Sequence, residues 1–301
     1  MIELYQPIIF GDPEQDGGRQ RFAGQTLSIH LPDPGATQTV VGDAFALTGM
    51  AIGGSDTLAC FAFTASVVIG DAVTLAGRAR GGHDNVIATS SISAFALGDA
   101  VLLKGRSSGG DDSVDVRGDG ATAYGDAYEM NGRSRGGDDI VTGAAFPLVA
   151  TQLFGDAQTL ADFALGGNDT LFAIVQGSGP GTMMFGDGAE LLDRTRGGND
   201  TLVSAANGNE TMWGDAAVVA PTAHTGADTF VFLPSNGKDT IMDFEPGNDK
   251  IELNGFGFDE LSDFTDAITY TEQGAVIALD DANSILVVGV TGLGASDFIL
   301  S

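Results

Sequence analysis

The chain has 301 residues, of which 43% are hydrophobic, and its 41 acidic side chains outnumber 13 basic ones to give a net charge of −28. This charge excludes nucleic acid as an expected partner, because a phosphate backbone requires a basic surface. The apolar content excludes a disordered, low-complexity chain. No stretch approaches the roughly 20 apolar residues of a membrane span, so none is expected. The opening residues Met1–Tyr5 lack a basic region, and we expect no N-terminal secretory signal.

Residues 1–36 do not share the pattern that follows. Four prolines and a Gly17-Gly18 pair favour loops and short strands in this segment. The first unit of a stacked array needs a cover for its open end. We therefore predict that residues 1–36 form an N-terminal cap.

A repeated unit begins at about residue 37 and runs to about 216 without a linker. Each copy opens with Gly-Asp and closes with Gly-Gly-x-Asp, and 11 residues separate the opening glycine from the closing pair in all six complete copies. The full period drifts over 28, 28, 27, 30, 31 and 28 residues. A period of this size predicts a solenoid whose units each bury an apolar face on the next.

Columns of apolar residues recur at fixed places in the copies, as a packed interior requires. One column precedes the opening glycine, another lies five residues after it, and a third follows the closing aspartate by two residues, as in Ile69, Leu75 and Val86. Strand-like runs such as Ala65–Ile69 and Thr57–Phe61 flank the glycine corners. We predict an all-β fold, a parallel β-roll or β-solenoid with coils of about 28 residues. The intervening Ala-x-x-Leu segment fits either one helical turn or an interrupted strand.

Two columns of carboxylates run along the predicted stack. Adjacent coils of a parallel stack lie about 4.8 Å apart, and like charges at that spacing repel by roughly 0.9 kcal/mol even in water. A divalent cation between successive coils would turn this repulsion into attraction. The opening column comprises Asp43, Asp71, Asp99, Asp126, Asp156, Asp187 and Asp215, and the closing column comprises Asp56, Asp84, Asp112, Asp139, Asp169 and Asp200.

The available ligands identify the kind of cation. The corners offer carboxylates and turn carbonyls, there is a single cysteine, Cys60, and the three histidines share no spacing. Oxygen ligands in an irregular cage favour calcium over zinc or magnesium. We therefore predict several Ca²⁺ ions as the cofactor, with His83 as a surface substitution rather than a ligand.

Seven of the ten arginines also fall within the fixed segment of the repeat. They could form a basic stripe for an anionic ligand, or they could pair with neighbouring aspartates on a solvated face. We favour the pairing. These arginines are Arg78, Arg80, Arg106, Arg133, Arg135, Arg194 and Arg196.

Beyond residue 216 the long period gives way to shorter units and then ends. Three short units carry the closing aspartate at Asp228, Asp239 and Asp249, and residues 259–301 lose the repeat but keep apolar runs. We predict that residues 37–258 form the repeat array and that residues 259–301 form a small C-terminal β cap.

Several of these motifs resemble the Gly-Gly-x-Gly-x-Asp nonapeptide of repeats-in-toxin (RTX) proteins. The clearest are Gly166–Leu171 and Gly197–Leu202, and Gly237–Leu253 is similar to the end of the roll in secreted members of that family. The resemblance implies calcium between coils, held by the closing-column aspartates together with Asp228, Asp239 and Asp249. It also implies that Asp297–Leu300 is similar to an uncleaved signal for type I export, with an extracellular location.

Taken together, the sequence predicts a secreted calcium-binding RTX-type β-roll whose folding is coupled to calcium. It predicts the type I secretion machinery as a partner and a structural or surface-associated role with cell-surface or polysaccharide contact. A polysaccharide lyase or epimerase is the alternative, since β-solenoids often carry such activities. We expect no enzyme, because the repeats, cap and tail use the whole chain and no His-Glu-x-x-His motif occurs. Ice binding is disfavoured because Asn85, Ser113 and Ile140 interrupt the threonine row.

Overall fold

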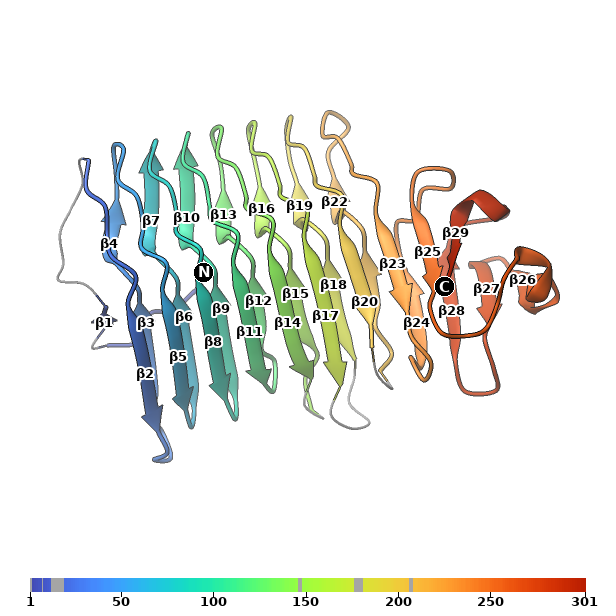
Figure 1. Cartoon of the computed structure of the whole chain (residues 1–301), viewed down its shortest axis with the longest axis horizontal. Coiled ribbons are helices and arrows are strands. Elements are labelled where there is room, and N and C mark those ends of the chain that lie inside the picture. Colours follow the sequence, from blue (N-terminus) through green and yellow to red (C-terminus); the bar gives the residue numbers. More distant parts are fainter. Residues whose placement is uncertain (1, 7, 12–18, 146–147, 176–180, 206–207) are drawn as a thin grey trace.

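The computed structural model describes residues 2–6, 8–11, 19–145, 148–175, 181–205 and 208–301. Its coils follow one another along the long axis of the molecule, from the blue to the red end in Figure 1. Strands in neighbouring coils pair in parallel, as β6 (Ala65–Ile69) pairs with β9 (Ser93–Leu97). The predicted all-β parallel solenoid with coils of about 28 residues is confirmed.

One coil illustrates the path of the chain. Strand β6 ends at Ile69, the Gly-Asp corner follows, and the chain continues as β7 (Ala72–Gly77). A returning limb then runs back through Arg80, which makes an isolated parallel bridge to the next coil. The Gly-Gly-x-Asp corner leads into β8 (Asn85–Ser90), after which the chain turns to start the next coil.

Among the described residues, these strands build three sheets, of 12, 10 and 7 strands. The 12-stranded sheet ends in an antiparallel meander, while its other pairings are parallel. Its strands in spatial order are β1 (Ile8–Phe10), β3 (Thr37–Val41), β6, β9, β12 (Thr122–Tyr124), β15 (Thr151–Phe154), β18 (Thr182–Phe185), β21 (Thr211–Trp213), β24 (Lys238–Ile241), β28 (Ser284–Val288), β27 (Gly274–Ala278) and β26 (Ile268–Tyr270).

The 10-stranded sheet is parallel throughout and takes up both the N-terminal segment and the end of the chain. Its strands in order are β2 (Thr26–Leu31), β5 (Thr57–Ala62), β8, β11 (Ser113–Gly118), β14 (Ile140–Ala145), β17 (Thr170–Val175), β20 (Thr201–Ser204), β23 (Thr229–Phe232), β25 (Lys250–Leu253) and β29 (Phe298–Leu300).

The 7-stranded sheet consists of the segments for which the sequence allowed a helical turn or a strand, and all of them are strands. They are β22 (Ala216–Val219), β19 (Gly188–Leu191), β16 (Ala157–Leu160), β13 (Ala127–Met130), β10 (Ala100–Gly105), β7 and β4 (Ala44–Leu47). Among the described residues, the helical content is confined to three short 3₁₀ turns, η1 (Leu261–Asp263), η2 (Thr265–Ala267) and η3 (Ala295–Asp297). No helix in the described parts of the chain has the length and apolar character to cross a membrane.

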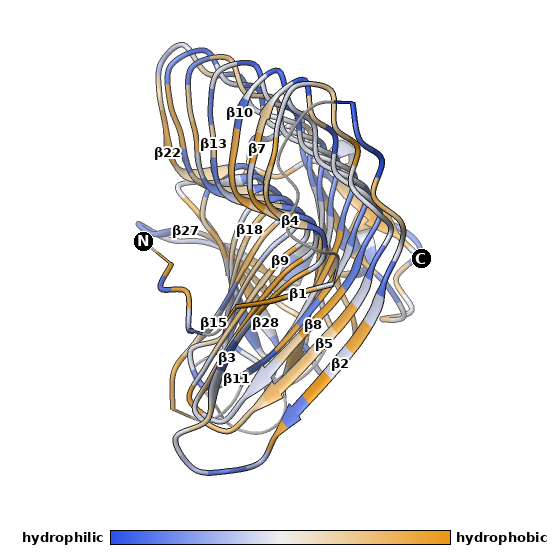
Figure 2. Ribbon diagram, turned by 90° about the vertical axis from the view of Figure 1, so that its left-hand side faces the viewer, coloured by the Kyte–Doolittle hydropathy of each residue, from blue (hydrophilic) through white to orange (hydrophobic). Residues whose placement is uncertain are grey.

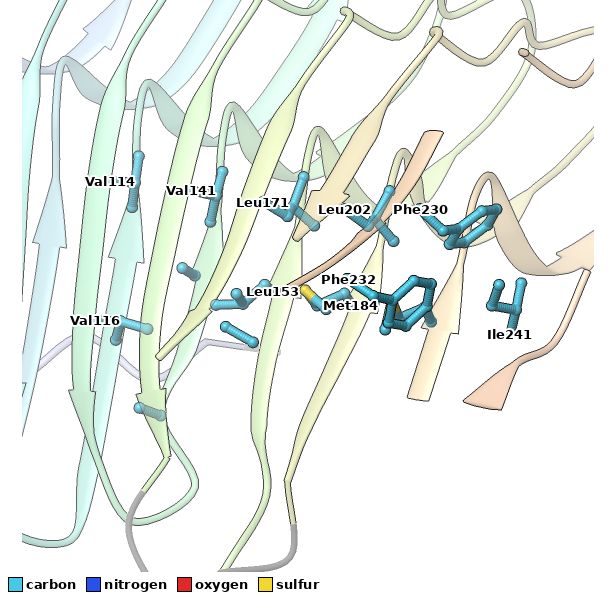
Figure 3. Close-up of a cluster of buried hydrophobic side chains, with 14 of the residues drawn as sticks. Val114, Val116, Val141, Leu153, Leu171, Met184, Leu202, Phe230, Phe232 and Ile241 are labelled. Carbon is cyan, nitrogen blue, oxygen red and sulfur yellow. The ribbon is translucent and has the colours of Figure 1, made fainter. Parts of the chain in front are cut away.

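In cross-section the molecule has two lobes (Figure 2). The main lobe lies between the 12- and 10-stranded sheets, where the column of residues two positions after the closing aspartates is buried, from Leu58 to Leu202. Figure 3 shows this column from Val114 to Phe230 as a row of side chains that repeat from coil to coil. The second lobe lies between the 7-stranded sheet and the returning limbs, and its core contains Leu75, Leu103 and small alanines. Two of the three predicted apolar columns thus form these two cores.

A third apolar cluster lies where the 12-stranded sheet meets the 7-stranded sheet, and it contains a stack of aromatic rings. The centroids of Tyr124 and Phe154 are 4.9 Å apart, those of Phe154 and Phe185 are 4.7 Å apart, and those of Phe185 and Trp213 are 4.5 Å apart. The rings are nearly parallel, with interplanar angles of 12°, 6° and 10°. Parallel register places equivalent residues of successive coils one above another, so these aromatic residues stack along the axis.

The predicted pairing of the arginines with aspartates is wrong. All seven arginines are exposed, so the face is solvated as predicted. Among the described residues, however, no carboxylate lies within 4.0 Å of any of them. The nearby aspartates instead accept backbone hydrogen bonds, as Asp162 does from Gly132 N–H at 2.9 Å.

Candidate metal centre

The opening aspartates join the point where the chain enters the second lobe to the point where it leaves the lobe. Each accepts a hydrogen bond from the second glycine of the closing pair in its own coil, which lies 11 residues further on. Gly167 N–H donates to Asp156 Oδ1 at 2.8 Å, and Gly137 N–H donates to Asp126 Oδ1 at 2.9 Å. The same bond joins Gly54 to Asp43, Gly82 to Asp71, Gly110 to Asp99, Gly198 to Asp187 and Gly226 to Asp215. This repeated bond explains why the 11-residue gap is constant.

The closing aspartates form a ladder between coils. Asp84 N–H donates to Oδ1 of Asp112 at 2.7 Å, and Asp112 N–H donates to Oδ1 of Asp139 at 2.7 Å. The ladder runs from Gln25 N–H, which donates to Asp56, through every closing aspartate to Asp249. One oxygen of each carboxylate therefore holds the next coil in register.

The other oxygen of most closing aspartates is buried and has no hydrogen-bond partner in the structure. These orphaned Oδ2 atoms belong to Asp84, Asp112, Asp139, Asp169, Asp200 and Asp228. Three opening aspartates, Asp126, Asp156 and Asp187, also keep an unpaired buried Oδ2. A buried polar atom without a partner costs about 1–3 kcal/mol, and more when it is charged. The repeated orphan oxygens therefore have the chemistry that fits a cation.

Glycine is required around these oxygens because the backbones of successive coils approach closely. A Cβ atom on Gly70 would collide with Asp84 Oδ2 and with the carbonyl oxygen of Gly98 in the next coil. A Cβ on Gly81 would collide with Asp99 Oδ1 and lie 2.6 Å from Asp71 Oδ2. Carboxylate and carbonyl oxygens of two adjacent coils thus converge on each glycine corner.

Burial of these carboxyl groups strongly disfavours their charged form. Loss of solvent is the largest cause, and it raises the pKa of Asp84 and of Asp228 to about 9. The pKa of Asp71 is raised well above its usual range by burial and then by the charges of Asp84, Asp99 and Asp43. Asp99 is raised only to about 6, because hydrogen bonds to its carboxylate oppose the effect of burial. These mutual influences show that the two columns face one another.

The donor set fits a hard cation. It consists of carboxylate oxygens and backbone carbonyls, which Ca²⁺ prefers in flexible cages of six to eight oxygens. Within the described residues, no three acidic, histidine or cysteine side chains come close enough to hold a metal ion by themselves. A bound cation would therefore need backbone carbonyls as well as the aspartates, and the glycine corners provide them.

Most of the predicted site residues belong to the two facing columns. All seven opening aspartates and the six closing aspartates of the long repeats are buried there, and Asp228 and Asp249 extend the closing ladder. Asp239 lies elsewhere, because β24 belongs to the 12-stranded sheet. Its Oδ1 accepts a hydrogen bond from Glu210 N–H at 2.9 Å, at the corner where the chain enters that sheet.

Two buried acidic residues of the corners were not predicted as site residues from the sequence. Glu210 is 1% exposed, burial raises its pKa to about 9, and its Gly208-Asn209-Glu210-Thr211 stretch resembles the end of the closing motif with glutamate in place of aspartate. Asp243 accepts hydrogen bonds from Gly214 and Asp215 N–H, and burial raises its pKa to about 7. The register of β21 with β24 places Asp243 opposite Gly214, beside the last opening aspartate, Asp215, and no glycine motif marks this position.

The fold and its corners define a β-solenoid of the RTX type. The model of the family described as Peptidase M10 serralysin C terminal matches residues 52–301, which is most of the chain. The chain belongs to this family. No curated protein matches the sequence significantly. The match concerns the C-terminal repeat region of these peptidases, which fits the calcium-binding RTX β-roll that the two aspartate columns suggest.

Proposed function

We propose that the chain is a secreted calcium-binding RTX β-roll whose folding is coupled to the ion. The observation that carries this proposal is the column of buried, unpaired Oδ2 atoms that faces the opening aspartates across the glycine corners. Bound Ca²⁺ would supply the positive charge that offsets the repulsion between these carboxylates. Because the ion would bind only the folded state, its free energy of binding would add to the free energy of folding.

The closing and the opening aspartates would have different roles in the site. The closing aspartates, such as Asp139 and Asp169, would hold register with Oδ1 and bind the cation with Oδ2. The opening aspartates, such as Asp126 and Asp156, would hold together the entry and the exit of the second lobe and present a second carboxylate. The glycine carbonyls would complete the cage.

Domain limits and export are part of the same proposal. Residues 1–36 would cap the first coil, residues 37–258 would hold calcium, and residues 259–301 would close the stack and carry the type I export signal. Without calcium the chain of charge −28 repels itself, which would keep it loose enough for export. Strand β29 pairs with β25, so the proposed signal at Asp297–Leu300 is free only in the unfolded chain.

No observation favours the alternative of a polysaccharide lyase or epimerase. Two Gly-x-Ser-x-Gly stretches occur, around Ser107 and Ser134, but both serines are buried, at 1% and 0% exposure. Each occupies the small-residue column in the core of the second lobe, as Ala79 does in the preceding coil. These serines are packing residues, so the motif does not indicate a nucleophile here.

A calcium titration of the whole chain tests the proposal. After treatment with a chelator, the far-ultraviolet circular dichroism at neutral pH should lose its β-sheet signal, and added Ca²⁺ should restore it cooperatively. Magnesium at the same concentration is the control and should be far less effective, because it requires octahedral geometry and dehydrates reluctantly. Equal melting temperatures with calcium and with chelator would refute the coupling.

A further inference from the structure

The arginines gather on one face of the second lobe. The returning limbs of successive coils make a ladder of single parallel bridges, in the order Arg21, Ile52, Arg80, Ser108, Arg135, Leu165, Arg196 and His224. In the six limbs between the first and the last, the residue two positions earlier gives a second exposed column on the same face, in the order Met50, Arg78, Arg106, Arg133, Phe163 and Arg194. Eight of the ten arginines of the chain belong to these two columns, which we call the arginine face. Figure 2 shows the second lobe that carries it.

The architecture turns these side chains outward. The residue between the two columns, such as Ala79 or Ser134, is buried in the lobe, and alternation along the limb exposes its neighbours on both sides. The limb is entered through a left-handed residue, with φ of 79° at Gly77 and 62° at Asp162. The two columns are therefore a consequence of the repeat and not of chance surface positions.

Within the described parts of the chain, the guanidinium groups of this face have no acidic partner within 4.0 Å. Arg78, Arg106 and Arg133 lie in three consecutive coils, about 4.8 Å apart along the stack. The aspartates that enter the limbs are engaged elsewhere, since Asp193 Oδ2 accepts a hydrogen bond from Asp162 N–H at 3.1 Å. The one arginine ion pair among the described residues joins Arg117 to Asp115 on the 10-stranded sheet, far from these columns in the coil.

Hollows and apolar groups complete the face. One hollow of about 410 Å³ is lined by Met50, Ile52, Arg78, Arg80 and Arg106. A second, of about 480 Å³, is lined by Arg106, Arg133, Asp162, Phe163 and glycines of the turns. Arg106 lines both hollows. Phe163 is 47% exposed, and the guanidinium carbons of Arg133 and Arg194 lie 5.6 and 6.0 Å from its ring centre.

We propose that the arginine face binds an acidic polysaccharide, a linear polymer of sugars that carry uronic-acid carboxylates. Arginine presents a planar fork that matches a carboxylate with two parallel hydrogen bonds. The columns repeat at the coil spacing, so a chain lying along the axis meets a new cation at every coil or every second coil. Phe163 offers a flat apolar surface to the C–H faces of sugar rings, and the flexible side chain of Met50 offers a second apolar contact.

The net charge of the protein favours such a ligand over nucleic acid. A polymer with no more than one charge per sugar meets less repulsion from a molecule of charge −28 than DNA, with one phosphate charge per about 1.7 Å of duplex. The proposal rests on the placement of the arginines and does not require the calcium assignment to be correct.

Binding of short hyaluronan oligosaccharides to the whole chain in calcium buffer, measured by calorimetry, tests the proposal. The carboxyl-reduced oligosaccharide of the same length is the control ligand and should not bind. The triple variant Arg78→Gln, Arg106→Gln, Arg133→Gln should bind at least about tenfold more weakly, and binding should weaken with added salt. Arg106→Gln alone should weaken binding, whereas Arg117→Gln removes the same charge from another face and should not.

Three results would overturn the proposal. They are equal binding of the carboxyl-reduced ligand, wild-type affinity in the triple variant, and tighter binding of single-stranded DNA that is lost in the same variant. The last result would assign the face to nucleic acid. The triple variant should keep the wild-type melting temperature, because the three side chains are exposed. If it does not fold, Arg106→Gln, compared with Arg117→Gln, decides the question.

Discussion

The two edges of the solenoid differ in how strictly the sequence is constrained. Where the chain passes from the 12-stranded to the 10-stranded sheet, the opening glycine and the closing pair are always 11 residues apart. Where it turns back, the distance from the closing aspartate to the next opening glycine varies from 13 to 17 residues. We call these the aspartate edge and the return edge. The comparison shows that buried carboxylates and close backbone contacts, rather than strand pairing alone, fix the length of a coil segment.

Removal of calcium should produce the largest difference in stability between the two edges, because the proposed ion sites lie at the aspartate edge alone. Each site occupied at 100 times its dissociation constant stabilises the fold by about 2.7 kcal/mol, and several sites act together. We expect the chelated chain to unfold at neutral pH, with hydrogen exchange fastest at the aspartate edge as calcium is lowered. Slower exchange there than at the return edge in the absence of calcium would contradict this expectation.

A methyl group at the aspartate edge should also be costly. In Gly82→Ala the new Cβ would collide with the carbonyl oxygen of Gly54 in the preceding coil, and we expect a loss of about 3 kcal/mol. Gly292→Ala is the matched control, because nothing lies within 4 Å of its Cβ, and it should change stability by less than about 0.5 kcal/mol. Chemical denaturation of both variants in calcium measures the difference, and equal losses would show that the close approach is not important.

Neutralising one closing aspartate should have opposite effects with and without calcium. Asp139→Asn keeps an oxygen for Asp112 N–H but removes a buried charge. With calcium we expect a loss of about 1–3 kcal/mol and fewer bound ions, whereas without calcium at neutral pH we expect a gain in stability. The control is Asp138→Asn, an exposed neighbour, which should change neither. A loss of stability in both conditions would contradict a metal-binding role for Asp139.

The stability of the metal-free chain should also depend on pH, because the aspartate edge buries its carboxyl groups. Burial raises the pKa of Asp84 from its ordinary value of 3.8 to about 9, so the folded state binds more protons than the unfolded state between these values. The metal-free fold should therefore be most stable in acid and lose stability as pH rises towards 9. The folded fraction, followed by circular dichroism between pH 4 and pH 9 with and without calcium, should converge at the acidic end. A metal-free folded fraction that rises with pH would contradict the burial of charged groups.

The return edge should tolerate insertion with the smallest effect. Two serines inserted between Ser91 and Ile92, which lie between β8 and β9, should cost less than about 1 kcal/mol, since loop-closure entropy grows slowly with length. One glycine inserted between Arg78 and Ala79 is the counterpart within the fixed segment. It should be far more destabilising, because it breaks the register of the limb and the bond from Gly82 to Asp71. Equal effects of the two insertions would remove the distinction between the edges.

The sequence was informative where a residue type recurred at constant spacing. The run Ala65–Ile69 was predicted with its correct ends, and the run Thr57–Phe61 ended one residue short of β5, because glycine corners delimit the strands. The apolar columns identified both cores for the same reason. The segments of the 7-stranded sheet stayed ambiguous, since a spacing of three residues suits a helical turn as well as a strand.

The predictions failed where the position of a residue depends on strand pairing between coils and not on a sequence motif. Asp239 follows a glycine like the closing aspartates, but its strand belongs to another sheet, and this depends on which strands pair. Asp243 accepts hydrogen bonds from the backbone of Gly214 and Asp215 without a glycine motif of its own. The arginines were expected to pair because acids are abundant, yet the nearby aspartates bind backbone amides. Each of these outcomes depends on contacts between coils that spacing along the chain does not reveal.

The stack of Tyr124, Phe154, Phe185 and Trp213 gives the protein an internal optical probe. The indole of the single tryptophan of the chain lies at the C-terminal end of this series of rings, and 4.5 Å separates it from the centre of Phe185. Light absorbed by Tyr124 can pass to Trp213 efficiently only while the intervening coils hold the rings close together. Energy transfer between the two residues would therefore report how many central coils have assembled at any moment of folding.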